Sequence, residues 1–177
     1  MSWVQIPADP HITVRICTLF IVLVYDPATD TWITKTPLPT RIEDYASAVV
    51  DNKIYIIGGA RNLALNQIYD PETDSWSSGA LLPTGFASAA AGVTTGAFSR
   101  QEIYVIGGKQ GVNAVNLNQV YNPGTDTWVK STAMPTARFS LGVAVVNDSL
   151  YAIGGHEGWF GLKFNQKKMT LMARPSA

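Results

Sequence analysis

Two short motifs recur along the chain, and their repetition constrains the fold more than any other feature. The first ends in tryptophan and occurs as VYDPATDTW at 24–32, IYDPETDSW at 68–76 and VYNPGTDTW at 120–128. The second ends in a glycine pair and occurs as IYIIGG at 54–59, IYVIGG at 103–108 and LYAIGG at 150–155. The tryptophans recur after 44 and 52 residues, and the glycine pairs after 49 and 47. A repeat of this length predicts an array of one structural unit.

Each repeat reads as a series of strands joined by tight turns. First strands are expected at Ala46–Val50 and Leu141–Val146, followed by turns at Asp51-Asn52 and Asn147-Asp148, residues that tolerate turn dihedrals. The second strand ends at the glycine pair, because glycine permits positive φ and close backbone approach. The tyrosine of the first motif lies on a third strand, its Asp-Pro-x-Thr-Asp segment forms a turn, and its tryptophan opens a fourth strand. The tryptophan is expected to pack between neighbouring sheets.

This order of elements resembles the kelch repeat, over roughly residues 20–155. Three Tyr-x6-Trp pairs and three glycine pairs carry the resemblance: Tyr25/Trp32, Tyr69/Trp76, Tyr121/Trp128, Gly58-Gly59, Gly107-Gly108 and Gly154-Gly155. The resemblance implies an all-β, kelch-type β-propeller. It is incomplete, with about three four-stranded antiparallel blades.

The repeats divide the chain into an irregular N-terminal segment (1–19), kelch blades (20–155) and a C-terminal tail (156–177). The blade region opens with a third and a fourth strand at about 20–36. Two full blades follow, at about 45–80 and 87–133. A first and a second strand close it at about 139–155, and this final half blade could pair with the opening half.

Three blades are fewer than the four to eight of most propellers. An arc of three blades would leave apolar blade faces open to water. Two explanations stay open: the chain is a piece of a longer propeller, or two chains pair head-to-tail as a homodimer that completes a six-bladed ring. The absence of repeat character at both ends favours the longer propeller.

Composition limits the function classes. Apolar residues make up 46% of the chain and charged residues 15%, as in a folded, sheet-rich protein. Lys+Arg and Asp+Glu number 13 each, so no overall field favours nucleic acid. Cys17 is the single cysteine and the chain has two histidines, His11 and His156. We therefore expect no cofactor and no metal site.

The apolar run Ile16–Tyr25 is too short to span a bilayer as a helix. It follows a single basic residue, Arg15, and continues directly into a repeat motif, which is not the pattern of a signal peptide. We expect a buried strand there, no membrane association and a cytoplasmic protein.

Candidate binding residues lie in the loops after the glycine pairs, Ala60–Asn66 and Lys109–Asn118, because loops on a rigid scaffold commonly carry recognition. The candidates are Arg61, Asn62, Lys109, Gln110 and Asn113, with His156 and Glu157 after the last pair. The alternative is that these loops are solvated connections. His156 and Glu157 alone do not assemble an acid–base centre.

The segment Met134–Arg138 resembles the kelch stretch in which an arginine points into the channel mouth, so the resemblance implies that Arg138 contacts ligand. Arg41 falls one position earlier in its repeat, and the middle repeat has no arginine there. A structural ion pair is the alternative role for Arg138.

The resemblance implies a non-enzymatic module that binds a protein or peptide through its inter-strand loops. The alternative is a fragment of a kelch-like sugar-processing enzyme of the sialic acid mutarotase type, using Arg41, Arg138 and Glu43. A copper-containing galactose oxidase is excluded, because Cys17 lies in an apolar strand and histidines are too few.

Overall fold

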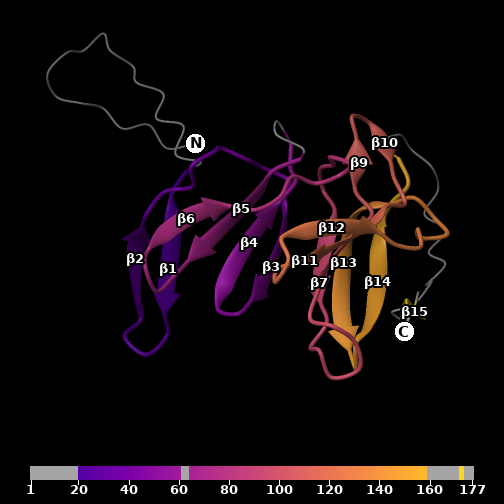
Figure 1. Cartoon of the computed structure of the whole chain (residues 1–177). Helices are drawn as coiled ribbons and strands as arrows, with labels where there is room; N and C mark the ends of the chain where they lie inside the picture. The colour runs from indigo at the N-terminus through magenta and orange to yellow at the C-terminus, as the bar shows by residue number, and fades with distance from the viewer. Residues whose placement is uncertain (1–19, 61–63, 159–171, 174–177) are drawn as a thin grey trace, which may run out of the picture. The chain divides into compact units, whose positions relative to one another are not determined.

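A computed structural model of the chain describes residues 20–60, 64–158 and 172–173 (Figure 1). Every regular element among these residues is a β-strand, and all strand pairs are antiparallel, which confirms the all-β class. The described part of the chain contains no helix that could span a membrane. The chain divides into two units, residues 1–41 and 42–177.

The first unit contains one hairpin, formed by β1 (Val22–Asp26) and β2 (Thr31–Lys35). Tyr25 lies opposite Trp32, with ring centroids 5.1 Å apart. The Tyr25 hydroxyl donates to Asp30 at 2.8 Å, and Asp26 accepts from the Ala28 amide at 2.9 Å. In this hairpin the Asp-Pro-x-Thr-Asp segment is therefore a turn. Its first aspartate accepts a hydrogen bond from the turn backbone, and its second accepts one from the tyrosine of the preceding strand.

The second unit contains the two full blades that the repeats predict, which are four-stranded sheets (Figure 1). The first blade consists of β3 (Ala46–Val50), β4 (Lys53–Ile57), β5 (Asn66–Asp70) and β6 (Ser75–Ser78). The second consists of β7 (Ala90–Val93), β8 (Ile103–Ile106), β11 (Asn118–Asn122) and β12 (Thr127–Lys130). In both blades the four strands pair in chain order.

The third sheet departs from the expected half blade in two ways. Its strands β13 (Phe139–Val146) and β14 (Ser149–His156) are longer than their counterparts, because β14 continues through Gly154-Gly155 where β4 and β8 stop before the glycine pair. A short third strand, β15 (Met172–Ala173), pairs with Leu150 and Tyr151 of β14. This partner comes from the C-terminal segment, whereas β1 and β2 form a sheet of their own.

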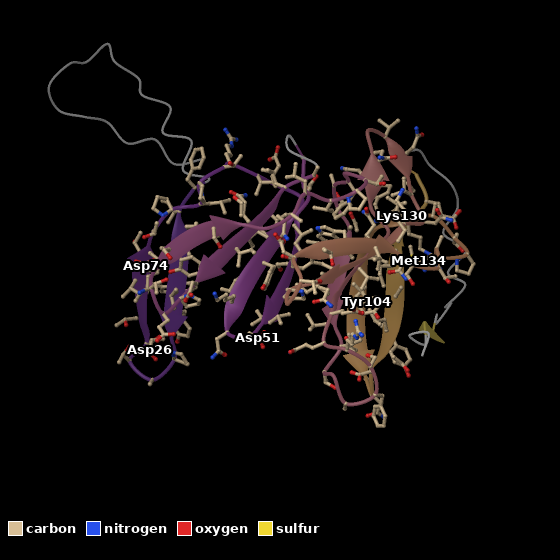
Figure 2. The ribbon with its side chains drawn as sticks, in the orientation of Figure 1. Asp26, Asp51, Asp74, Tyr104, Lys130 and Met134 are labelled. Atoms are coloured by element: carbon tan, nitrogen blue, oxygen red, sulfur yellow. The ribbon has the colours of Figure 1, made fainter. Side chains whose placement is uncertain are left out.

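Two apolar clusters join the three sheets of the second unit. The first lies between the first and second blades and contains Ala46, Ala48, Val50, Tyr55, Ile57, Leu82, Phe86, Ile103, Val105 and Tyr121. The second lies between the second blade and the third sheet and contains Tyr104, Ile106, Val120, Met134, Leu141, Leu150 and Ala152. Figure 2 labels Tyr104 and Met134 of this second cluster. The sheets therefore cover one another's apolar faces, as stacked blades do.

The tyrosine–tryptophan motif connects neighbouring blades. Tyr121 and Trp128 lie with ring centroids 4.9 Å apart, and the Tyr121 hydroxyl donates to Asp126 at 2.7 Å. Asp126 also accepts from the Ala80 amide of the preceding link at 2.6 Å, and the Trp128 indole donates to the Ala80 carbonyl at 2.9 Å. The expectation that this tryptophan packs between blades is confirmed for Trp128, which contacts the first cluster.

Both predicted two-residue turns are present, and all four of their residues have positive φ. The values are 49° for Asp51, 58° for Asn52, 49° for Asn147 and 54° for Asp148. Aspartate and asparagine are the non-glycine residues that tolerate this region best. The segment after the second glycine pair differs from the expected loop, because it folds into a hairpin of β9 (Lys109–Gln110) and β10 (Asn113–Ala114).

Candidate functional site

The strand topology places the candidate loops of the second unit at one end of the blades. Residues that precede each first strand and residues that follow each glycine pair lie together at this end, which we call the glycine-pair end. It comprises residues 42–45, 58–60, 79–89, 107–117, 131–138 and 154–157. The turns between first and second strands lie at the other end, which we call the turn end.

Two series of backbone hydrogen bonds cross the blades at the glycine-pair end. The second glycine of each of the first two pairs donates to the link of the next sheet, from Gly59 to the Phe86 carbonyl and from Gly108 to the Arg138 carbonyl, both at 2.8 Å. A second series joins Asp44, Ser88 and Ser140, as the Ser88 amide donates to Asp44 at 2.6 Å and the Ser140 amide donates to Ser88 at 2.8 Å. All three of these residues have positive φ, from 54° to 58°. The backbone of this end is therefore fixed across three sheets.

A row of four side chains crosses the same end. Lys109 forms an ion pair with Asp44, with 3.4 Å between Nζ and Oδ2. The Lys109 ammonium also lies 5.6 Å from the centroid of the Phe139 ring, in cation–π range. The Phe139 ring lies 5.8 Å from the ring of His156 on β14. The row Asp44–Lys109–Phe139–His156 therefore links the first blade, the second blade and the third sheet.

Arg138, at the same end, is buried. Only 8% of Arg138 is exposed, and its guanidinium donates to the Gly154 carbonyl at 3.0 Å. The residues at the equivalent position of the first two blades are Ile42 and Phe86, both buried and apolar. The strand register supports this equivalence. Ile42, Phe86 and Arg138 each lie four positions before a first-strand residue whose partner is the isoleucine directly before a glycine pair. Those isoleucines are Ile57, Ile106 and Ile153.

The other candidates are distributed between the two units. Gln110 and Asn113 are exposed on the β9–β10 hairpin, where the Gln110 amide donates to the Gly85 carbonyl at 3.1 Å. His156, Glu157 and Glu43 are exposed at the glycine-pair end. Arg41 belongs to the first unit, whereas Arg138 belongs to the second. Arg61 and Asn62 lie outside the described residues.

The structure also contains a feature that the repeat pattern did not reveal, at the turn end. Asp148 is only 1% exposed, and its carboxylate accepts four hydrogen bonds from the segment between β7 and β8. The donors are the amides of Thr95, Phe98 and Ser99 and the hydroxyl of Thr95, at 2.6 to 3.2 Å. These bonds, led by the one from the Phe98 amide, outweigh burial and lower the pKa of Asp148 to about 2.

We expect Asp148→Asn to lower the melting temperature by several degrees at pH 7, because an amide cannot replace the carboxylate as a fourfold acceptor. The folded state favours the ionised form, so this stabilisation is complete above the ordinary carboxyl pKa of 3.8 and is lost as the pH falls toward 2. The difference between wild type and variant should therefore shrink over that range. Asp51→Asn, at an exposed turn residue, is the control and should leave melting nearly unchanged. A difference that stays constant from pH 7 to pH 2 would contradict the assignment.

Comparison with known proteins agrees with the repeat pattern. The family model described as the Kelch motif matches residues 43–80 and 94–135, which contain the first blade and most of the second. A kelch repeat and BTB domain-containing protein 2 of cowpox virus (strain Brighton Red) is 33% identical over 136 residues, covering 76% of this chain and 24% of the viral protein.

Vertebrate proteins show a similar match. Kelch-like protein 40 of Xenopus tropicalis is 30% identical over 140 residues, covering 78% of this chain and 22% of that protein. Kelch-like protein 28 of Homo sapiens is 33% identical over 134 residues, covering 76% of this chain and 16% of that protein. The chain spans about a quarter or less of the length of these relatives. From its repeated motifs, its stacked antiparallel blades and these matches, the chain belongs to the kelch-repeat family.

Proposed function

We propose that the chain is a protein-interaction module that binds its partner at the glycine-pair end. The observation that carries the proposal is the row Asp44–Lys109–Phe139–His156, whose members come from the link before β3, the β9–β10 hairpin and the third sheet. Two series of inter-blade hydrogen bonds hold the backbone beneath it. A surface fixed in advance loses little conformational entropy when a partner binds. The names of the relatives, which are kelch-repeat and kelch-like proteins, also support an interaction module.

The chemistry of this end fits a polar segment. Its exposed groups include the Asp44 and Glu157 carboxylates, the His156 imidazole and the side chains of Gln110 and Asn113. These groups offer both hydrogen-bond donors and acceptors. A loop or an extended peptide with polar side chains can pair with them, whereas a strongly acidic ligand would meet the like charge of the two carboxylates.

A selection from a phage-displayed library of short random peptides on the purified chain tests the proposal. Peptides that bind this end should lose at least about tenfold in affinity on the double variant Asn113→Ala/His156→Ala, which removes two exposed polar side chains. Glu72→Ala, at an exposed turn residue of the turn end, is the matched control. If every selected peptide binds the double variant as tightly as the wild type, the proposal fails.

Sialic acid is the control ligand for the sugar-processing alternative. In this structure the guanidinium of Arg138 is buried and bonded to Gly154, so the alternative requires that group to move. Saturable sialic acid binding that Arg138→Ala abolishes would replace the interaction module with a sugar site.

We also propose that the outer face of the third sheet packs against a blade of a second copy of the chain. Val50 and Thr94 are buried, Val50 in the cluster between the first and second blades, whereas their equivalent Val146 is exposed. In the same way, Ile57 and Ile106 are buried and Ile153 is exposed. The outer face of the third sheet therefore has apolar residues at positions whose equivalents are buried in the first two blades. An exposed apolar face of this kind favours association with another protein surface.

Light scattering after size-exclusion chromatography measures this association. We expect the mass of two chains for the wild type and of one chain for Ile153→Lys, while Val129→Lys, on the outer strand β12, retains the wild-type mass. A wild-type mass of one chain at every concentration would rule out the pairing of two copies.

A further inference from the structure

The connection between β7 and β8, residues 94–102, is much longer than its counterparts in the other sheets. The first strand and the second strand are joined by two residues at Asp51-Asn52 and again at Asn147-Asp148. Those turns show that closing the hairpin needs no more than two residues. The extra length of the β7–β8 loop therefore has no role in forming the sheet.

This loop is held in one conformation by bonds at its base and by bonds to the next sheet. At the base, the Thr94 amide donates to the Glu102 carbonyl at 3.1 Å, and the Thr94 hydroxyl accepts from the Glu102 amide at 3.0 Å. The Thr94 hydroxyl also donates to the Arg100 carbonyl at 2.5 Å. Asp148 of the third sheet accepts from Thr95, Phe98 and Ser99. The loop is therefore fixed both to its own strands and to the third sheet.

The fixed loop exposes an aromatic side chain. Phe98 is 80% exposed, more than any other large apolar residue in the described part of the chain. Its amide is bonded to Asp148, so its backbone is held while its ring faces water. An aromatic ring on a preorganised backbone is the usual anchor of a protein interface, since burial of the ring gains free energy and little ordering is needed.

We propose that the β7–β8 loop is a second protein-binding site, at the opposite end of the blades from the glycine-pair end, with Phe98 as its anchor. Its partner is a segment with apolar side chains beside a carboxylate. Phe98 packs against those apolar side chains, and the exposed guanidinium of Arg100, two residues along the loop, pairs with the carboxylate. The carboxylate of Asp148 is occupied by its four donors and does not compete for Arg100.

The same phage-displayed peptides test this site separately from the proposed function. A class of peptides rich in apolar and acidic residues should lose at least about tenfold in affinity on Phe98→Ala, while Asn113→Ala/His156→Ala leaves that class unchanged. Arg100→Gln should weaken the same class and reduce its sensitivity to salt. Val129→Ala removes an exposed aliphatic side chain from β12 and is the matched control.

Asp148 positions the β7–β8 loop and does not itself contact the partner. The variant Asp148→Asn is therefore tested by hydrogen exchange as well as by peptide binding. Amide hydrogen exchange should show faster exchange at Thr95, Phe98 and Ser99, together with weaker binding of the Phe98-dependent peptides, while the protection of β8 and β11 is retained. A selection in which every peptide binds Phe98→Ala as tightly as the wild type would overturn the proposal.

Discussion

Gly107→Ala is expected to lower the free energy of unfolding by about 2–5 kcal/mol. Gly107 has a φ of +70°, which costs an L-residue about 1–2 kcal/mol. A Cβ at this position would also lie 2.5 Å from the backbone oxygen of Arg138, and relief of such a clash adds about 1–3 kcal/mol. The oxygen belongs to the link that accepts from Gly108, so the substitution separates the second blade from the third sheet.

Gly154→Ala separates the cost of a positive φ from the cost of the steric clash. Gly154 is also the first glycine of its pair, with a φ of +71°, but a Cβ there would meet no atom of the described residues within 4 Å. It should therefore cost only the backbone penalty of about 1–2 kcal/mol. Urea unfolding of the two variants measures the difference. Equal losses would mean that the glycine pair serves local backbone conformation alone and not the approach of the next blade.

Phe86→Ala is expected to lower the free energy of unfolding by about 3–5 kcal/mol. Phe86 is fully buried in the cluster between the first and second blades, and its ring lies against Gly58, where a Cβ would come within 2.5 Å of it. Truncation leaves a cavity that the flanking backbone cannot fill, since the Phe86 carbonyl is bonded to the Gly59 amide.

The exposed aromatic Phe98 provides the control for this substitution. Phe98→Ala should change the free energy of unfolding by no more than about 0.5 kcal/mol, because the ring is exposed. Phe86→Leu retains most of the volume and should cost less than Phe86→Ala. Similar urea midpoints for Phe86→Ala and wild type would show that the two blades do not pack through this cluster.

The sequence predicted the blades because their motifs act locally. Each Tyr-x6-Trp segment forms a hairpin with the same contacts, and in the second unit Tyr69 donates to Asp74 at 2.6 Å as Tyr121 does to Asp126 at 2.7 Å. Turn residues such as Asn52 and Asn147 adopt the positive φ that their chemistry favours. These features depend on neighbours in the chain, so a pattern of residue types is enough to find them.

The candidate site was harder to predict, because its geometry depends on residues far apart in the chain. Lys109 could be named a candidate binding residue because it lies in a loop after a glycine pair. Its partners Asp44 and Phe139 could not be predicted, because they lie 65 positions before it and 30 after it. The resemblance implies that Arg138 contacts ligand, and this stays a prediction. Its burial could not be foreseen, because it depends on a register that gives Arg138 the same position as the buried residues Phe86 and Ile42.

The hydrogen bonds that Asp148 accepts from the β7–β8 loop were also not predicted, for a related reason. A single aspartate in a two-residue turn matches the turn preference without further explanation. Its donors Thr95, Phe98 and Ser99 lie about fifty positions earlier, in a loop that interrupts the repeat. The unusual length of that loop, compared with the two other connections, was the one signal in the sequence that could have marked it.

Amide hydrogen exchange of the chain, with and without a peptide whose binding depends on Asn113 and His156, tests whether the glycine-pair end is the binding surface. We expect slower exchange on binding at that end, in residues 109–114, 139–140 and 156–157. Protection confined to the turn end, at residues 71–74 or 123–126, would contradict it.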